Sequence, residues 1–163
     1  MLLSATASAT SVPLLTFEQL TDQSEMVVSG QIARTWSDWD SSHRFIWTHY
    51  ELAVGALYKG LAGSTVVLSE PGGAVGASSQ IVADAVRYAV GDRVFVFLQR
   101  MPNGYLRTTG WAQGKYIVDA ASRVHAASAL AMASRPVDGL STRELAARVT
   151  TRVQQTKSIG VRQ

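Results

Sequence analysis

Two side chains with metal-ligand chemistry, His49 and Glu51, lie two residues apart in a segment whose alternating pattern predicts a β-strand. Because alternate residues of a strand project from the same face, this imidazole and this carboxylate would stand side by side. A zinc site needs three or four ligands, so His43 or His125 would have to fold in beside them. Nothing in the spacing demands this arrangement, and we expect no resident metal and no other cofactor.

The patterns of nucleophilic and phosphate chemistry are incomplete. Ser69 and Ser78 lie near glycines, but the chain has no G-x-S-x-G turn that would expose a serine between a strand and a helix. The glycine-rich segment 72–76 lacks the Lys-Ser/Thr pair that completes a phosphate-binding loop. The chain also has no cysteine, which excludes disulfides, thiolate zinc sites and cysteine nucleophiles. We therefore expect a protein that is not an enzyme.

Aromatic residues gather around one expected hairpin. Trp36 and Trp47 lie on either side of the polar segment 37–43, Trp39 lies within it, and Arg44 lies among them. Trp and Arg are typical anchors of protein interfaces, and OB-fold barrels bind sugars or single-stranded nucleic acids by stacking on such rings. The simpler interpretation is that some rings close the fold while others anchor the hairpin. Any that are exposed would form a binding patch, so these four residues are the candidate binding residues.

The elements that must position these side chains are mostly strands. Alternation is clearest over residues 46–56, which we expect to form one long strand. Further strands are expected at 26–36, 65–69, 94–98, 105–108 and 114–118, with the last paired to 123–125. The segment 70–73 breaks the strand before it and opens a glycine- and serine-rich loop that runs to residue 80. This series of strands and turns predicts an antiparallel β-barrel.

Capping boxes predict a helix near each end of the chain. Thr16 and Gln19 can satisfy the first free N–H groups of a short helix that ends near residues 22–25. Ser141 and Glu144 have the same spacing and open a helix that runs to about residue 157. The apolar stripe of this second helix is narrow, so we expect it to pack lightly on the barrel or on a partner: Leu145, Val149 and Val153.

Positive charge is concentrated in the C-terminal part of the 163-residue chain. Six basic and two acidic residues lie from position 134 onward, whereas residues 1–133 carry nine basic and ten acidic side chains. The body is therefore close to neutral, which argues against nucleic acid as a partner, because nucleic-acid binding needs a basic groove. No apolar stretch is long enough for a membrane-spanning helix.

The first nine residues are similar to the end of a signal peptide. Ala7-Ser8-Ala9 fits the small-residue cleavage site, which places the mature start at Thr10. We therefore expect an extracytoplasmic protein, periplasmic or secreted. Its expected parts are a signal-peptide remnant at 1–9, a barrel domain at 10–133 and a basic helical tail at 134–163.

A series of short motifs runs through the predicted barrel: residues 24–32, 48–54, Lys59-Gly60, Gly72-Gly73, 90–98 and 113–118. Their order resembles a family of uncharacterised secreted bacterial proteins. More distantly, it is similar to netrin modules and the tissue inhibitors of metalloproteinases. The resemblance covers about residues 12–119 and implies a mainly β protein, an OB-like antiparallel barrel with a short N-terminal helix and a C-terminal helix.

The proposed mature N-terminus departs from the inhibitor pattern. In those inhibitors, the resemblance implies, a free N-terminal cysteine caps the catalytic zinc of the protease. Here Thr10-Ser11-Val12-Pro13 keeps the proline and has no cysteine. The N-terminal amine and the hydroxyl of Thr10 could approach a metal, but far more weakly than the cysteine of the inhibitor pattern.

The function expected from the sequence is therefore a secreted, non-enzymatic binding module with a protein partner. An exported protease is one candidate partner, with the protein acting as a metalloprotease inhibitor-like protein. A metal-binding protein or metal-dependent enzyme that uses His49 and Glu51 is one alternative. Another is a barrel that binds sugar or nucleic acid through the Trp36–Trp47 hairpin.

Overall fold

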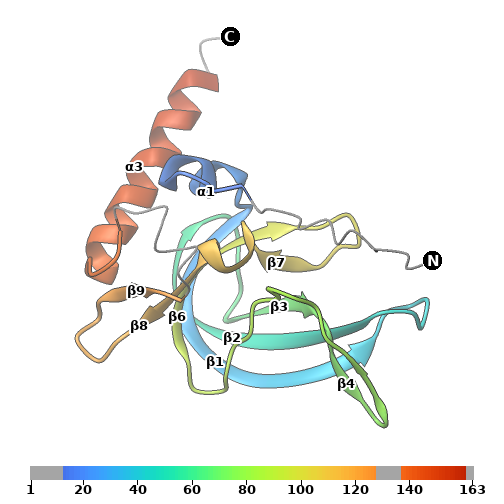
Figure 1. Ribbon diagram of the computed structural model, residues 1–163. Helices are drawn as coiled ribbons and strands as arrows, with labels where there is room; N and C mark the ends of the chain where they lie inside the picture. The colour runs from blue at the N-terminus through green and yellow to red at the C-terminus, as the bar shows by residue number, and fades with distance from the viewer. Residues whose placement is uncertain (1–12, 128–136, 161–163) are drawn as a thin grey trace, which may run out of the picture.

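The chain folds into a strongly curved antiparallel sheet with two helices packed against one side of it (Figure 1). This computed structural model describes residues 13–127 and 137–160. Its elements are α1 (Phe17–Gln23), β1 (Met26–Trp39), β2 (Ile46–Lys59), β3 (Thr65–Pro71), β4 (Gly73–Val75), β5 (Ser78–Gln80), β6 (Arg93–Arg100), β7 (Leu106–Thr108), the 3-10 helix η1 (Trp111–Gly114), β8 (Lys115–Val118), β9 (Val124–Ala126) and α3 (Thr142–Gly160). The fold is mainly β, as expected. Neither of the two α-helices in these ranges has the length and apolar character needed to cross a membrane.

Both predicted capping boxes are confirmed. The Thr16 hydroxyl accepts the backbone N–H of Gln19 at 3.1 Å, and the Gln19 side chain accepts the N–H of Thr16 at 2.9 Å. At the start of α3, Ser141 and Glu144 make the same reciprocal pair, at 3.2 and 2.8 Å. These bonds satisfy N–H groups that have no partner within the helix, so each helix begins where the sequence places it.

Strand β1 is shared between the two halves of the sheet. The seven-stranded sheet has the order β3-β2-β1-β6-β8-β9, and β7 pairs with the end of β6. Nearly the whole of β1 pairs with β2, whereas only residues 26–31 also pair with β6. Its register with β2 shifts at three places, and such bulges bend a strand and increase its twist. Figure 1 shows the resulting curve of β1. The expected pairing of β8 with β9 is confirmed.

The outer strands β3 and β7 meet through a side chain, and their backbones do not pair. Glu70 of β3 is fully buried and accepts the backbone N–H of Thr108 in β7 at 2.8 Å. Glu70 belongs to the strand itself: β3 continues through Pro71, so the expectation that the strand breaks at residue 70 is wrong. The partners of Glu70 come from β7, so the local Glu-Pro-Gly-Gly pattern could not indicate its burial.

The expected glycine- and serine-rich loop contains a two-stranded hairpin, β4–β5, that lies across the end of the β1–β2 hairpin. Gly73 permits this contact, because its φ is +144° and an added Cβ would lie 2.5 Å from Thr48 Oγ1 and 2.6 Å from Ser37 Oγ. The Gln80 side chain fastens the other strand: it accepts the N–H of Ile46 at 2.7 Å and donates to the carbonyl of Arg44 at 2.9 Å.

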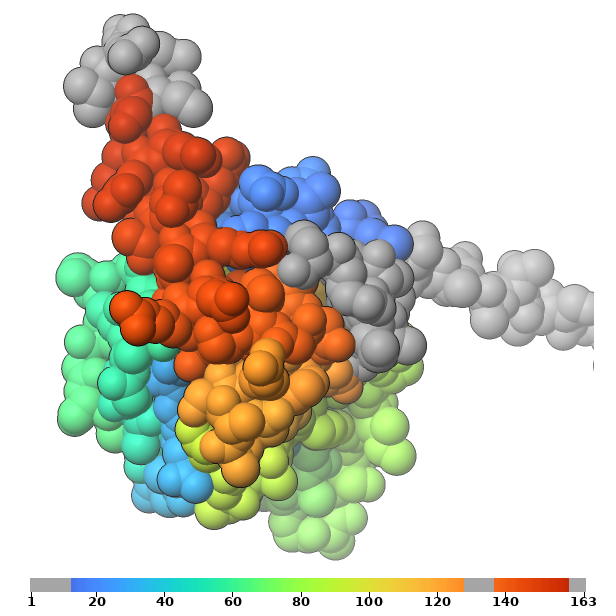
Figure 2. All heavy atoms as spheres, turned by 90° about the vertical axis from the view of Figure 1, so that its left-hand side faces the viewer, coloured from blue at the N-terminus to red at the C-terminus, as the bar shows by residue number. Residues whose placement is uncertain are grey.

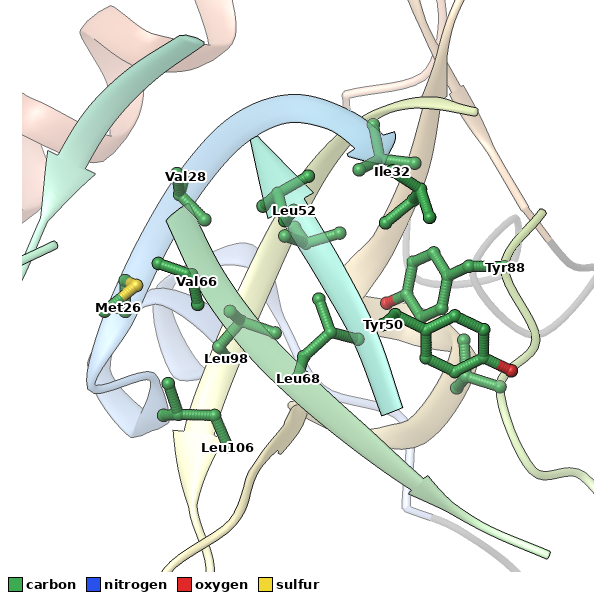
Figure 3. Close-up of a cluster of buried hydrophobic side chains, with 13 residues drawn as sticks. Met26, Val28, Ile32, Tyr50, Leu52, Val66, Leu68, Tyr88, Leu98 and Leu106 are labelled. Carbon is green, nitrogen blue, oxygen red and sulfur yellow. The ribbon is translucent and has the colours of Figure 1, made fainter. Parts of the chain in front are cut away.

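The hydrophobic core has two parts, one on each side of the sheet. The inner cluster fills the concave side, where side chains from the strands point toward one another and Tyr50 lies beside Tyr88 (Figure 3). It is made of Met26, Val28, Ile32, Tyr50, Leu52, Val66, Leu68, Val86, Tyr88, Val94, Val96, Leu98 and Leu106. The outer cluster lies between the convex side and the helices: Leu20, Val27, Phe95, Phe97, Tyr116, Val118, Val124, Val137, Leu145 and Val149.

Helix α3 packs more firmly than its narrow stripe predicts. Leu145 and Val149 have no exposed surface, and Val153 is half-buried against the same cluster. The expectation of light packing is therefore wrong for the first half of the helix. Figure 2 shows α3 lying over the sheet and beside α1. Two fully buried residues suffice because they enter a cluster that already contains Phe95 and Phe97 from the sheet.

Candidate functional site

The β1–β2 hairpin places two of its tryptophans on one face. Trp36 is paired across the strands with His49, and Asp38 is paired with Trp47. Residues that face each other across strands project from the same side of the sheet. This is the side opposite Ile46, which contacts Gly73 of β4. Trp36 and Trp47 are both half-buried, so part of each ring remains accessible.

The structure separates Trp39 and Arg44 from that face. Trp39 is paired with Ile46 and therefore lies on the side covered by β4. Arg44 lies in the hairpin turn, where its guanidinium is 5.8 Å from the centre of the exposed Phe45 ring. Asp40 shapes this turn by accepting the N–H groups of Arg44 at 2.8 Å and Phe45 at 3.1 Å. These bonds hold the pKa of Asp40 below its usual value.

Two segments beyond the hairpin complete the face. Tyr105, just before β7, lies in edge contact with Trp47 at 5.0 Å and with His49 at 5.5 Å between ring centres. The guanidinium of Arg107 lies over two indoles, 5.9 Å from Trp47 and 4.6 Å from Trp111. At the other end, the guanidinium of Arg34 lies 4.7 Å above Trp36. We call this row the aromatic–arginine face: Arg34, Trp36, Trp47, His49, Tyr105, Arg107 and Trp111.

Trp111 adopts an uncommon backbone conformation. Its φ is +57°, in the left-handed region, and it follows Gly110, whose φ is +62°. A bulky residue in this region is strained by about 1–3 kcal/mol and keeps the conformation only when its surroundings enforce it. The cation of Arg107 over its ring is one such contact. Strain of this kind clusters at ligand-binding and active sites, which makes Trp111 a candidate binding residue.

The arginines of the face are neutralised by carboxylates. Arg34 donates to Glu51 at 3.0 Å, and Arg107 donates to buried Glu70 at 3.2 and 3.3 Å. A paired arginine contributes planar surface and hydrogen-bond donors but little net charge. The aromatic–arginine face is therefore close to neutral.

His49 and Glu51 do lie on one face, as the alternation predicts, but each already has a partner. His49 is buried, and its Nδ1 makes a 2.8 Å hydrogen bond with the hydroxyl of Ser69. Burial lowers the pKa of His49, so its ring is neutral at neutral pH. The other histidines do not join it: His43 lies by Trp39, and His125 pairs with Asp119 at 2.8 Å. Within 13–127 and 137–160 no three histidine, cysteine, aspartate or glutamate side chains could hold a metal ion together.

Sequence reasoning found part of this face and missed part of it. It named Trp36 and Trp47, but Tyr105, Arg107 and Trp111 were not candidates. Alternation along 105–108 does place Tyr105 and Arg107 on one face of a strand. No local pattern says that this strand lies beside the β1–β2 hairpin. Thr10, the remaining candidate, lies outside the described residues.

Comparison with protein-family models, with curated proteins and with solved structures finds no match for this chain.

Proposed function

We propose that this protein is a non-enzymatic binding module and that the aromatic–arginine face binds a protein partner. One observation carries the proposal. Rings from β1, β2, the β7 region and η1 gather on one accessible face, and none of them belongs to either hydrophobic cluster. Half-buried Trp, Tyr and Arg side chains are the residues most enriched at the energetic centres of protein interfaces.

The geometry of the rings favours a protein over a sugar or a nucleic acid. Stacking of a sugar or base needs an open ring face, but Arg34 covers Trp36 and Arg107 covers Trp111. Trp47 meets Tyr105 at 68°, so the pair presents an edge and a corner instead of a flat platform. Nucleic acid would also need unpaired cations, whereas both arginines of the face are paired.

The proposal has three further parts, which concern the fold, the family and the location. We propose an OB-like, partly open barrel, supported by β1 being shared between two sheet halves and by Glu70 linking β3 to β7. The order of motifs supports a relationship to the secreted bacterial family and, distantly, to netrin modules. The small-residue run before Thr10 supports an extracytoplasmic location.

Inhibition of an exported metalloprotease is a narrower form of the same proposal. It depends on the Thr10 end of the chain and not on the aromatic–arginine face. Adding protein that starts at Thr10 to such a protease from the same organism should slow substrate cleavage. Unchanged cleavage at a large molar excess of the protein would exclude the inhibitor hypothesis.

Affinity capture from the culture fluid of the native organism tests the main proposal. Three immobilised proteins are compared: the wild type, the double variant Trp36→Ala/Trp47→Ala, and Trp39→Ala, which changes a tryptophan on the other side of the hairpin. We expect a partner that the wild type and Trp39→Ala retain and the double variant loses. Equal retention by all three, or no specific partner for the wild type, would contradict the proposal.

A further inference from the structure

Glu70 is a carboxylate without exposed surface at the place where β3 meets β7. One of its oxygens accepts the N–H of Thr108, and the other accepts two donors from Arg107, at 3.2 and 3.3 Å. The hydroxyl of Thr108 is hydrogen-bonded at 2.6 Å to Tyr88, which belongs to the inner cluster. Glu70 thus connects the interior of the sheet with a side chain of the aromatic–arginine face.

Arg107 transmits this connection to two tryptophans. Its side chain is 13% exposed, and its guanidinium lies over Trp111 and, at longer range, over Trp47. The two indoles come from η1 and β2, and they share this one cation. The position of Arg107 therefore influences how the two rings lie relative to each other.

The carboxylate is what keeps Arg107 in that position. The free energy of a cation–π contact is comparable to the rotamer entropy that an arginine side chain loses when it is fixed, so the rings alone do not hold Arg107 in place. A charge-assisted pair with a buried carboxylate is roughly twice as strong as a neutral hydrogen bond and fixes the plane of the guanidinium. Without that pair, a mostly buried cation would be left uncompensated and would turn toward water.

We infer that Glu70 is a positioning residue of the binding surface: acting through Arg107, it sets the arrangement of Trp47 and Trp111 and thereby controls partner binding. The part about binding rests on the proposed function, whereas the part about the rings does not. A purely structural role, in which Glu70 only links β3 to β7, is the competing explanation.

Glu70→Gln separates the two roles. The glutamine keeps the size of the side chain and an oxygen that can accept the N–H of Thr108, but it removes the charge that faces Arg107. Glu51→Gln is the matched control, because it removes the carboxylate from the other arginine of the face, Arg34. Arg107→Lys keeps the positive charge but loses the planar fork.

The first readout needs no partner. In ¹⁵N–¹H spectra, the four tryptophans of the chain give four indole N–H signals. We expect Glu70→Gln to shift the signals of Trp47 and Trp111 and to leave that of Trp36 in place. Glu51→Gln, which acts on Arg34, should shift the signal of Trp36 and leave those of Trp47 and Trp111 in place. If Glu70→Gln fails to fold, Arg107→Lys must shift Trp47 and Trp111. Unshifted signals in the folded variant would overturn the inference.

The second readout uses the partner recovered by capture. We expect Glu70→Gln and Arg107→Lys each to weaken binding at least tenfold. The variant that combines these two substitutions should bind no more weakly than the weaker-binding of the two single variants. The inference would be overturned if Glu70→Gln bound the partner with wild-type affinity while Trp36→Ala/Trp47→Ala did not bind it. That result would leave the proposed function intact. Shifted indole signals without any captured partner would support the positioning of the rings and contradict the proposed function.

Discussion

The Glu70 side chain links two strands, β3 and β7, that share no backbone hydrogen bonds. The ladder between β3 and β7 is absent, and a buried carboxylate takes its place by accepting a backbone N–H from the opposite strand. Burial raises the pKa of Glu70 above its ordinary value of 4.5, and the bonds from Thr108 and Arg107 offset this only in part. Ionising Glu70 in the folded protein therefore lowers the free energy of unfolding, and this loss depends on pH.

The pH dependence of stability should reveal that loss. Because the folded-state pKa of Glu70 is raised, its contribution to stability is complete below about pH 4.5, and it is lost as the pH rises through the raised value. We expect the wild type to lose stability relative to Glu70→Gln from pH 4.5 toward neutrality, measured by urea denaturation. Arg107, Tyr88 and Lys115 also face Glu70, but both proteins retain them. A stability difference that does not change with pH would contradict this prediction.

Gly30 is a residue whose missing side chain permits a close approach of strands. A Cβ at this position would lie 2.0 Å from the carbonyl oxygen of Ala53 in β2, a distance that no rotamer change can relieve. Gly55 lies nearby, but a Cβ there would meet Ser29 O at an ordinary 3.5 Å. We expect Gly30→Ala to lower the free energy of unfolding by at least about 1–3 kcal/mol, whereas Gly55→Ala changes it by less than about 1 kcal/mol. Equal values for the two in chemical denaturation would show that β1 and β2 can separate there.

At the scale of elements, α3 is held to the rest of the molecule by two kinds of contact. Leu145 and Val149 are fully buried in the outer cluster. Further along the helix, Arg152 donates to Asp22 of α1 at 2.9 Å, and this bond keeps the pKa of Asp22 below its usual value. Because both ion-pair partners are about one-third exposed, solvent screens the pair and it adds little to stability. Burial is therefore the dominant attachment.

Single substitutions can rank these two contacts. We expect Leu145→Ala to destabilise the protein by about 2–5 kcal/mol, since it removes a buried side chain and leaves a cavity. Arg152→Ala should cost much less stability than Leu145→Ala, because solvent screens the ion pair that it removes. Thermal unfolding followed by circular dichroism would measure both. A larger loss for Arg152→Ala would mean that the ion pair, and not the outer cluster, holds the helix.

Local signals explain which elements could be predicted from the sequence. The two capping boxes and the alternation of 46–56 involve residues within a few positions of one another, so α1, β2 and the start of α3 were found. The contacts of Tyr105 and Trp111 with the β1–β2 hairpin join residues far apart in the chain, and no local pattern encodes them. Trp39 was grouped with Trp36 because the sequence predicts a turn from residue 37. In the structure β1 continues as a strand through Trp39, and the alternation of that strand places the two rings on opposite sides.

For the whole molecule, the two clusters are joined through the same strands. Val27 and Phe97 belong to the outer cluster, while their neighbours Val28, Val96 and Leu98 belong to the inner one. Since β1 and β6 contribute side chains to both clusters, unpacking one cluster would expose the strands that support the other. This differs from a barrel with an attached tail, in which the helix could leave without consequence for the strands.

We therefore expect the full chain to unfold in a single cooperative transition. The four tryptophans lie in β1, β2 and η1, so their fluorescence reports the sheet and the aromatic–arginine face. Circular dichroism at helix wavelengths reports mainly α3, which is by far the longer of the two α-helices in the described ranges. Because α3 buries Leu145 and Val149 against Phe95 and Phe97 of β6, both signals should change at the same urea concentration. Leu145→Ala should move both midpoints down together. Loss of the helix signal before the fluorescence changes would instead show that α3 is a separable appendage and that the sheet is stable without it.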